Sequence, residues 1–337
     1  MSFLYKPSIW SKLLTPLSWL LGLLIALRKK LYQVGIFGIS KSTLPVIVVG
    51  NITVGGTGKS PLVAYLVKEL VQRGLKPGIV SRGYGGKSNN YPLLIQASTS
   101  ASEAGDEAKM LAESCQVPVV VDPDRSQAVR FLAEHSDCDV VLSDDGLQHY
   151  AMARHVEIVV IDKSRALGNR LLLPLGPLRE PASRLNSVSA VVHNYRFNQP
   201  LPKLEKSSVP AFQASFTANG FVSVSDASIR LSVSELRERL EQSKQPAYAV
   251  AGIGNPQSFF DYLCAQNIEC DTQPFADHHD FTAQDFSAAQ DFILMSEKDA
   301  IKCRHLQLDN AWFLAIEMQV SPNLADFCLE QIARKER

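Results

Sequence analysis

Short apolar runs alternate with longer amphipathic stretches along most of the chain. Runs of this length and composition predict buried strands. They cover residues 46–49, 77–81, 118–121, 139–142, 156–162 and 190–193. After the first run, the apolar residues from Leu62 to Leu70 recur at helical spacing. Strands that alternate with helices in this way predict a doubly wound, mostly parallel α/β sheet.

The pattern changes near residue 200. A proline-containing stretch at 198–210 predicts a linker, and residues 212–224 predict a β-hairpin that turns at Asn219-Gly220. A strand, a glycine turn and a helix begin at Ala249, and a late strand covers 293–296. The length of 337 residues favours two domains. The predicted parts are an N-terminal helix within 1–35, a larger α/β core at 36–205, a hairpin linker at 206–230 and a smaller α/β domain at 231–337.

An apolar segment flanked by basic residues lies near the N-terminus. Residues 17–27 are almost wholly apolar, and Arg28, Lys29 and Lys30 follow them. The run is shorter than the ~20 residues that a spanning helix needs. It therefore predicts a helix that lies in one leaflet, with its basic residues at the head groups. The alternatives are a core-facing helix and a signal peptide, although a signal peptide needs small residues where Arg-Lys-Lys stands.

Composition narrows the range of partners. Lys plus Arg and Asp plus Glu both number 34, so the chain is formally neutral. Nucleic-acid-binding proteins usually carry a basic face, so we expect no nucleic-acid partner. The six cysteines are scattered without a C-x-x-C pair, which favours a reduced cytosolic protein over a disulfide framework or a zinc site. No obligate protein partner is predicted.

A glycine-rich loop joins the first predicted strand to its helix. The loop residues are Thr53, Val54, Gly55, Gly56, Thr57, Gly58, Lys59 and Ser60. Glycines let backbone N–H groups approach phosphate oxygens, Lys59 would reach the β- and γ-phosphates, and Ser60 would ligate Mg²⁺. Thr53 stands where the strict phosphate-loop pattern has its first glycine, and a plain glycine-rich turn is the alternative. The flanking strand and helix nevertheless favour a nucleoside triphosphate site.

Carboxylates follow one predicted strand and begin one predicted helix. Asp144 and Asp145 follow the strand at 139–142, where phosphate-loop proteins place the acid that holds Mg²⁺. The alternative is a polar strand end, but Gln148 and His149 make this cluster denser than a strand end requires. Asp106 begins a helix, where an acid is ordinarily a capping or dipole residue.

Three further segments carry candidate ligand-binding residues. The glycine-rich segment that holds Arg82 and Tyr84 either covers a ligand or is a plain flexible loop. Arg179 and Glu180 lie between prolines and either face phosphate and metal or form a solvated turn. The stretch at 277–280, Asp-His-His-Asp, suggests metal ligation or an imidazole oriented by a carboxylate. Adjacent residues of an extended loop point to opposite sides, so we expect one functional and one structural histidine.

The ordered set of motifs resembles the tetraacyldisaccharide 4′-kinase family, the lipid A kinases. The motifs are Gly-Gly-Thr-Gly-Lys-Ser-Pro, Arg-Gly-Tyr-Gly-Gly, Gly-Asp-Glu, Asp-Asp-Gly-Leu-Gln-His, Gly-Pro-Leu-Arg-Glu-Pro, Asp-His-His and Ser-Glu-Lys-Asp-Ala. The resemblance covers essentially the whole chain and implies a P-loop NTPase-like fold that uses ATP and Mg²⁺. It implies phosphorylation of the 4′-hydroxyl of a tetraacylated glucosamine disaccharide 1-phosphate. The product would be lipid IVA, made at the cytoplasmic face of the inner membrane of a Gram-negative bacterium.

The same resemblance implies roles for individual residues. The catalytic candidates are Asp106, His278 and Lys59, with His279 as the alternative to His278. The metal-site candidates are Ser60, Asp144, Asp145 and Glu180. The candidates for binding the lipid substrate are Arg82, Tyr84, Gln148, His149 and Arg179. This chain departs from the family at Ala108, where proline is common.

Two other functional classes share some of these features. A membrane-tethered regulatory ATPase of the partitioning type has a deviant phosphate loop and can use an amphipathic helix to reach a bilayer. That interpretation leaves Asp106, His278 and the second domain without a role. A GTPase would need Asn-Lys-x-Asp to read its base, and Glu297-Lys298-Asp299 does not supply it.

Overall fold

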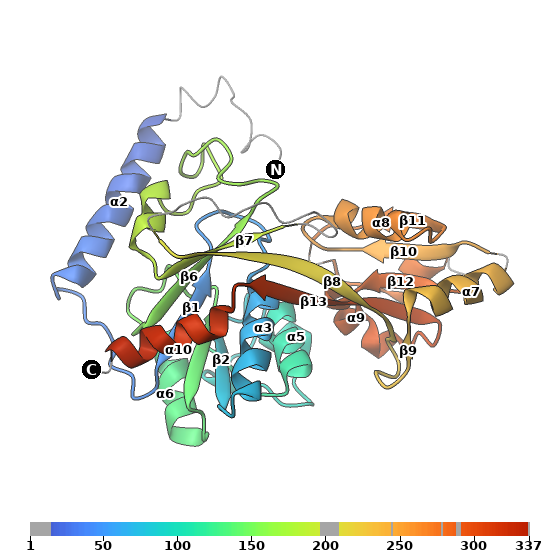
Figure 1. Cartoon of the computed structure of the whole chain (residues 1–337), viewed down its shortest axis with the longest axis horizontal. Coiled ribbons are helices and arrows are strands. Elements are labelled where there is room, and N and C mark those ends of the chain that lie inside the picture. The colour runs from blue at the N-terminus through green and yellow to red at the C-terminus, as the bar shows by residue number, and fades with distance from the viewer. Residues whose placement is uncertain (1–14, 196–208, 244, 278, 288–290, 336–337) are drawn as a thin grey trace.

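Parallel strands form the first half of a sheet that extends through the molecule (Figure 1). The computed structural model describes residues 15–195, 209–243, 245–277, 279–287 and 291–335. The strands of this half are β1 (Val46–Gly50), β2 (Pro77–Ser81), β3 (Leu93–Leu94), β4 (Val119–Val121), β5 (Val140–Asp144), β6 (Val156–Asp162) and β7 (Ala190–Asn194). Their order is β7-β6-β1-β5-β2-β4-β3, and only the β3–β4 pair in it is antiparallel. The predicted doubly wound, mostly parallel sheet is confirmed.

Helices cover both faces of this half. They are α3 (Lys59–Gln72), α4 (Ala101–Ala104), α5 (Asp106–Cys115) and α6 (Arg125–His135). Along β1, Ile47 and Val49 pack with α3 and α5, whereas Val46 and Val48 pack with α6. Successive side chains of a strand point to opposite faces, and both faces are covered here. Every residue of β1 is therefore buried, as its unbroken apolar run predicts.

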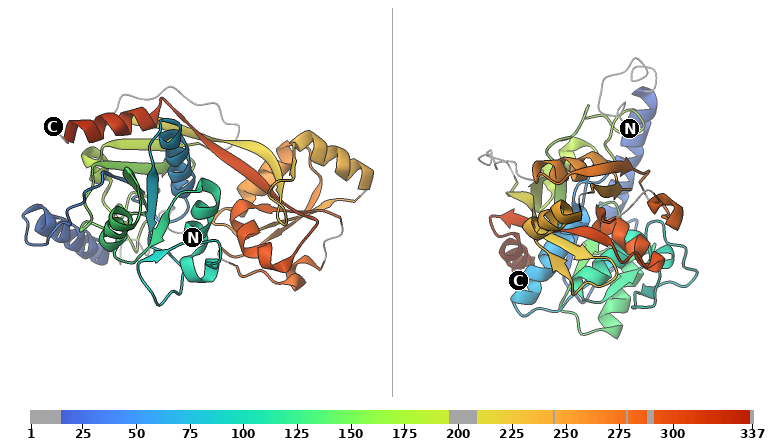
Figure 2. Two further views of the ribbon diagram at one scale, coloured as in Figure 1. Left: turned by 90° about the horizontal axis from the view of Figure 1, so that it is seen from below. Right: turned by 90° about the vertical axis from the view of Figure 1, so that its right-hand side faces the viewer.

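The second half of the sheet continues from β7 without a break (Figure 2). Its strands are β8 (Ala211–Ser223), β9 (Arg230–Leu231), β10 (Ala247–Ala251), β11 (Cys270–Pro274), β12 (Ile293–Ser296) and β13 (Ala311–Ser321). Its helices are α7 (Val233–Ser243), α8 (Pro256–Ala265) and α9 (Glu297–Cys303). The full order of the 13-stranded sheet begins β11-β10-β12-β13-β8-β7, with β9 paired to β8. The long strands β8 and β13 connect the two halves.

The predicted hairpin turn at Asn219-Gly220 is wrong. Residues on both sides of this dipeptide belong to one strand, β8, which pairs with β13 from Gln213 to Ser223. The register shifts there by one residue, so that Asn219 and Gly220 both oppose Ala315 as a β-bulge. Gly220 has a φ of 88°, which glycine adopts without strain. The chain reverses later, between Val224 and Ile229, before β9.

The last described helix, α10 (Leu324–Lys335), packs on the first half of the molecule. Its side chains Leu324 and Cys328 are fully buried in the cluster that contains Leu62 of α3. Figure 1 shows α10 lying against the phosphate-loop half rather than against β10–β12. By its packing this helix belongs with the first half, although the sequence places it in the smaller C-terminal domain at 231–337.

The apolar N-terminal helix is α2 (Thr15–Gln33). Its large apolar side chains are exposed, with Trp19 at 74% and Leu23 at 65%, and Ser18 is the residue that it buries. The alternative of a core-facing helix therefore does not hold. None of the helices that the structure describes combines the length and the apolar character needed to cross a bilayer.

Candidate active site

The predicted site residues gather where parallel strands end. The loop at 51–58 follows β1, the loop at 82–86 follows β2, and Asp144 ends β5. Ligands of open α/β sheets bind outside the carboxyl ends of the strands. The order of the strands therefore brings motifs distant in sequence to one edge.

Asparagine side chains hold the glycine-rich loop in place. Asn51 is fully buried, and its Nδ2 lies 3.3 Å from the Gly55 carbonyl and 3.2 Å from Thr57 Oγ1. Asn194, at the end of β7, donates to the Thr57 carbonyl at 2.9 Å. Gly58 has a φ of 93°, and a Cβ there would lie 2.4 Å from Asn194 Nδ2. The loop therefore needs glycine at this position for both backbone and space.

A second loop supports the first residues of the phosphate loop. Thr53 forms an isolated antiparallel bridge with Leu178, and Val54 N donates to the Pro177 carbonyl at 2.8 Å. The Arg179 N–H donates to the Ile52 carbonyl at 2.7 Å. Thr53, where the strict pattern has glycine, is thus 5% exposed and held by strand-like pairing. The departure from the pattern is accommodated by this neighbouring loop.

Lys59 and Ser60 meet the carboxylates at the end of β5. Ser60 Oγ donates to Asp144 Oδ2 at 3.2 Å, and Lys59 Nζ lies 3.9 Å from Asp145 Oδ1. Arg179 Nη1 also lies 3.1 Å from Asp145 Oδ2. Arg125, at the start of α6, donates to the Asp145 carbonyl at 3.2 Å. The structure therefore brings together the predicted residues of two motifs more than 80 positions apart.

Asp144 fits the role of a cation ligand. It is 1% exposed, and its Oδ1 has no hydrogen-bond partner among the residues that the structure describes. Burial raises the pKa of this carboxyl well above its usual value, Glu107 adds to that rise, and Lys59 opposes it. The described residues contain no cluster of three or more acid, histidine or cysteine ligands. Mg²⁺ usually takes only one or two protein carboxylates together with substrate phosphates, so Asp144 and the Ser60 hydroxyl are a suitable set.

Glu180 lies in a buried hydrogen-bond network. Its Oε1 accepts from Gln148 at 2.8 Å, and its Oε2 accepts from Tyr150 Oη at 2.6 Å. Arg184 Nε lies 3.2 Å from the same Oε2. Gln148 also donates to the Asn51 carbonyl at 3.0 Å, which connects this network to the phosphate loop. Both oxygens of Glu180, a predicted metal ligand, therefore already contact protein groups.

His149 and two arginines lie at the ends of neighbouring strands. His149 Nε2 is 3.3 Å from Asp124 Oδ1, and burial together with Arg125 lowers the pKa of this imidazole. Burial and the nearby Arg82 lower the pKa of the Arg125 guanidinium. Two guanidinium groups close to one another favour an anionic partner. Arg82 and His149 were predicted from the sequence, whereas Arg125 was not.

Asp106 begins α5 and lies beside the glycine-rich segment after β2. A Cβ on Gly105 would lie 2.6 Å from the Tyr84 carbonyl, and one on Gly86 would lie 2.6 Å from the Glu103 carbonyl. The two glycine-containing motifs therefore pack backbone to backbone. Asp106 Oδ2 lies 3.5 Å from Lys302 Nζ of α9, and the Tyr84 side chain is 72% exposed.

His279 has a structural environment. Its ring stacks on Phe275 at 4.5 Å between centroids and meets Phe281 edge-on at 4.9 Å. Its Nε2 is 3.3 Å from Asp285 Oδ2. His278, the predicted catalytic histidine, lies outside the described residues.

Several residues of the site escaped prediction. They are Asn51, Arg125, Tyr150, Arg184, Asn194 and Lys302. Asn51 is the first residue of the loop at 51–58, so its position was a usable signal. Tyr150 directly follows the predicted Gln148 and His149, and Arg184 lies four residues after the predicted Glu180, so both were also close to a predicted motif. Arg125, Asn194 and Lys302 reach the site from other segments, and no local pattern marks them.

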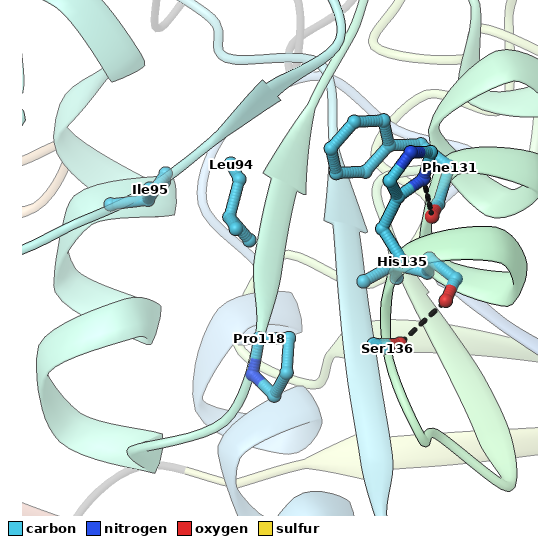
Figure 3. Close-up of a pocket in the computed structure, with 7 residues that line it drawn as sticks. Leu94, Ile95, Pro118, Phe131, His135 and Ser136 are labelled. Atoms are coloured by element: carbon cyan, nitrogen blue, oxygen red, sulfur yellow. Dashed lines mark hydrogen bonds between the residues drawn. The ribbon is translucent and has the colours of Figure 1, made fainter.

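Two hollows occur in the part of the chain that the structure describes. One cavity of about 250 Å³ lies between β3, β4 and α6 and is lined by Leu94, Ile95, Pro118, Phe131, Leu132, His135 and Ser136. Figure 3 shows His135 stacked near Phe131, with its Nδ1 3.0 Å from the Phe131 carbonyl. Another, of about 280 Å³, lies between α2 and residues 180–184. The first contains none of the predicted site residues.

Known proteins resemble this chain over nearly its whole length. A model of the family described as tetraacyldisaccharide-1-P 4′-kinase matches residues 10–333. The tetraacyldisaccharide 4′-kinase of Tolumonas auensis is 43% identical over 331 residues, covering 97% of this chain and 95% of that protein. The protein of the same name from Methylobacillus flagellatus is 42% identical, covering 98% and 94%. The crystal structure of "apo" form LpxK from Aquifex aeolicus in complex with ATP superimposes with a TM-score of 0.80 and 26% identity, covering 96% of this chain and 100% of that one.

Proposed function

Because the chain belongs to the tetraacyldisaccharide-1-P 4′-kinase family, we propose that it transfers the γ-phosphoryl group of ATP to a lipid. The acceptor is the 4′-hydroxyl of a tetraacylated glucosamine disaccharide 1-phosphate, and the product is lipid IVA. The observation that carries the proposal is the meeting of Lys59 and Ser60 with Asp144 and Asp145 at the end of β5. A cation, a hydroxyl and two acids beside a glycine loop are what triphosphate binding requires.

The phosphate loop positions the triphosphate. Loop N–H groups and Lys59 hold the phosphates and offset the charge that develops during transfer. Ser60 and Asp144 would hold Mg²⁺, with Asp145 beside them. When bound, the ion neutralises charge on the β- and γ-phosphate oxygens. The Oδ1 of the buried Asp144, for which the described part of the chain offers no hydrogen-bond partner, supports this assignment.

Asp106 is the general base of the proposed reaction. It accepts the proton of the 4′-hydroxyl as the sugar oxygen forms its bond to the γ-phosphorus, and the bond from that phosphorus to the β,γ-bridging oxygen breaks to release ADP. Its place at the start of α5, beside the glycine-rich segment after β2, supports this role. His278 orients or tunes Asp106. The aromatic packing of His279 supports the choice of His278, because His279 is already engaged with Phe275, Phe281 and Asp285.

Glu180 positions neighbouring residues. Contacts from Gln148, Tyr150 and Arg184 engage both its oxygens, so direct binding to Mg²⁺ would require breaking at least one of them. Through Gln148 it supports the start of the phosphate loop. Arg82, Tyr84, Gln148, His149 and Arg179 surround the acceptor side of the site in this proposal.

Helix α2 brings the enzyme to the cytoplasmic face of the inner membrane. Leu20, Leu23, Leu24 and Leu27 are each more than half exposed, and Lys29 and Lys30 follow. Exposed apolar surface on a helix with basic residues at its end is suited to the interface of an anionic bilayer.

Deleting residues 1–30 should release the protein from vesicles and raise the KM for lipid. Continued sedimentation of the truncated protein with vesicles would place the anchor elsewhere.

The chemistry is tested by following label from γ-labelled ATP. The purified protein is incubated with detergent-dispersed tetraacyl disaccharide 1-phosphate, and the products are separated by thin-layer chromatography. We expect label in a bisphosphorylated lipid. Release of labelled phosphate without labelled lipid would favour the regulatory ATPase.

Asp106→Ala is expected to lower kcat by about 10²–10⁴-fold, which is the usual contribution of a general base, with little change in ATP affinity. Single-turnover transfer and nucleotide binding measure the two effects separately. Full activity of this variant would remove Asp106 from the role of base.

A further inference from the structure

Two lysines of α9 face the helix that carries Asp106. Lys298 and Lys302 are four residues apart, so they lie on the same side of α9. Both belong to the segment that begins with Ser-Glu-Lys-Asp-Ala, for which the proposed mechanism gives no role. Helices α5 and α9 are in contact, and Figure 2 (left) shows α9 beside the phosphate-loop half of the molecule.

Each lysine connects one group of α5 with one group of the segment between β11 and η3 (Ala283–Phe286). Lys302 Nζ lies 3.5 Å from Asp106 Oδ2 and 3.2 Å from the His279 carbonyl. Lys298 Nζ lies 3.6 Å from Glu107 Oε1 and 3.3 Å from Asp277 Oδ1. The two lysines therefore connect the same two segments, one helical turn apart on α9.

The ion pairs of the two lysines differ in how far they are exposed to solvent. The Lys302 side chain is 6% exposed and its partner Asp106 is 19% exposed. The partners of Lys298, in contrast, are each more than 40% exposed. Water and salt screen exposed pairs, and such pairs contribute little. The contact with a fixed geometry is therefore the one between Lys302 and Asp106. Lys302 also lies 3.9 Å from the fully buried Asp299.

We propose that Lys302 is a positioning residue for phosphoryl transfer. Its ammonium group holds the Asp106 carboxylate at a fixed place relative to the backbone carbonyl of His279. This inference rests on the proposed function, because it assigns Lys302 a role through the general base. An ammonium that contacts both groups fixes their separation, and a base must meet its proton in a narrow range of geometry. A displacement of about 1 Å in an active site can cost 10²-fold in rate.

A purely structural role makes a different prediction, and Arg304 provides the matched control. Arg304, which directly follows α9, pairs with Glu113 of α5, but Glu113 lies at the other end of α5, seven residues from Asp106. Arg304→Met therefore removes an ion pair between α5 and the residue that follows α9 without touching the proposed base.

The test measures kcat and KM of the full chain with ATP and the lipid acceptor. We expect Lys302→Met to lower kcat by about 10²-fold with little change in the KM for ATP. Lys302→Arg, which keeps the charge, should recover part of the loss. Arg304→Met should leave kcat near that of the unchanged protein. In an Asp106→Asn background, Lys302→Met should cause no further loss, because the two residues then act as one unit.

Two results would overturn the inference. The first is an unchanged kcat for Lys302→Met, and the second is the same loss of kcat in the presence and absence of Asp106→Asn. Thermal unfolding shows whether each variant is folded, and if Lys302→Met is not, Lys302→Gln and Lys302→Arg enter the same comparison. Failure of the unchanged protein to label the lipid would instead overturn the proposed function and this inference with it.

Discussion

Two strand–glycine turn–helix units of this molecule differ in what meets the turn. In the first, β1 leads through the glycine loop to α3, and Lys59 and Ser60 face carboxylates that belong to another strand. In the second, β10 leads through Gly252 to α8, and the Gly252 N–H donates to Asp299 Oδ2 at 3.0 Å. The second turn has therefore bound a carboxylate of the protein itself. The same order of strand, glycine turn and helix thus serves the proposed nucleotide site in one unit and structural support in the other, and the two turns differ in the charged side chains beside them.

The largest expected effect comes from removing the cation of the first turn. Lys59→Ala should lower the transfer rate at least as much as Asp106→Ala, by about 10²–10⁴-fold, because charge on the transferred phosphoryl group then lacks its nearest cation. Steady-state transfer with saturating acceptor measures this. An unchanged rate would exclude the phosphate-loop interpretation itself, and Asn255→Ala in the second turn is the control that should leave the rate unaltered.

A smaller effect, on stability, is expected in the second turn. Asp299→Ala leaves the buried Gly252 N–H and the Ser296 hydroxyl without their acceptor. An unsatisfied buried donor costs about 1–3 kcal/mol, so the free energy of unfolding should fall by that amount. Urea unfolding measures it, with Asp299→Asn as the variant that keeps an acceptor oxygen. An unchanged midpoint for Asp299→Ala would show that the carboxylate does not support this turn.

The smallest effect should have the opposite sign, at the first turn. Because burial raises the pKa of Asp144, the folded state holds that proton more tightly than the unfolded chain does. The folded protein is therefore destabilised most by Asp144 at pH values above the raised pKa. This loss of stability shrinks as the pH falls toward the usual pKa of aspartate. Asp144→Asn should therefore raise the melting temperature at pH 8 by about 2 °C or more, without nucleotide and metal, and the gain should diminish at pH 5.

Activity should move against stability in that variant. Loss of transfer together with a higher melting temperature at pH 8 would identify Asp144 as a residue kept for function at a cost to the fold. If Asp144→Asn instead melts lower at pH 8, the charge on Asp144 is already compensated within the protein.

The comparison of the two turns also shows how far the sequence predicts structure. The strands of the first half were predictable because each is a short apolar run buried on both faces, as Val46 to Gly50 is. The pairing of Asn219-Gly220 with Ala315 was not, because an Asn-Gly dipeptide favours a turn locally and its partner strand lies about 90 residues further along the chain. At this dipeptide the long-range pairing of β8 with β13 outweighs the local preference for a turn.

The candidate site follows the same division. Lys59, Ser60, Asp144 and Asp145 were predictable because each lies in a short motif next to a strand. The contacts that support the site were not, since Asn194 donates to the Thr57 carbonyl 137 positions away and Lys302 contacts Asp106, almost 200 positions earlier. A binding motif consists of consecutive residues and can be recognised in the sequence. The contacts that stabilise it depend on which strands and helices become neighbours in the fold.

The packing of α10 has a consequence for the order in which the chain folds. Leu324, Ala325 and Cys328 complete the cluster that contains Leu62 and Leu66, so the hydrophobic core beneath the phosphate loop needs residues made long after that loop. Chains emerge from the ribosome N-terminus first, and contacts of large sequence separation form slowly. Until α10 leaves the ribosome, the face of α3 that it covers stays open to solvent and to chaperones. The core beneath the phosphate loop is thus completed only after α10 has been made.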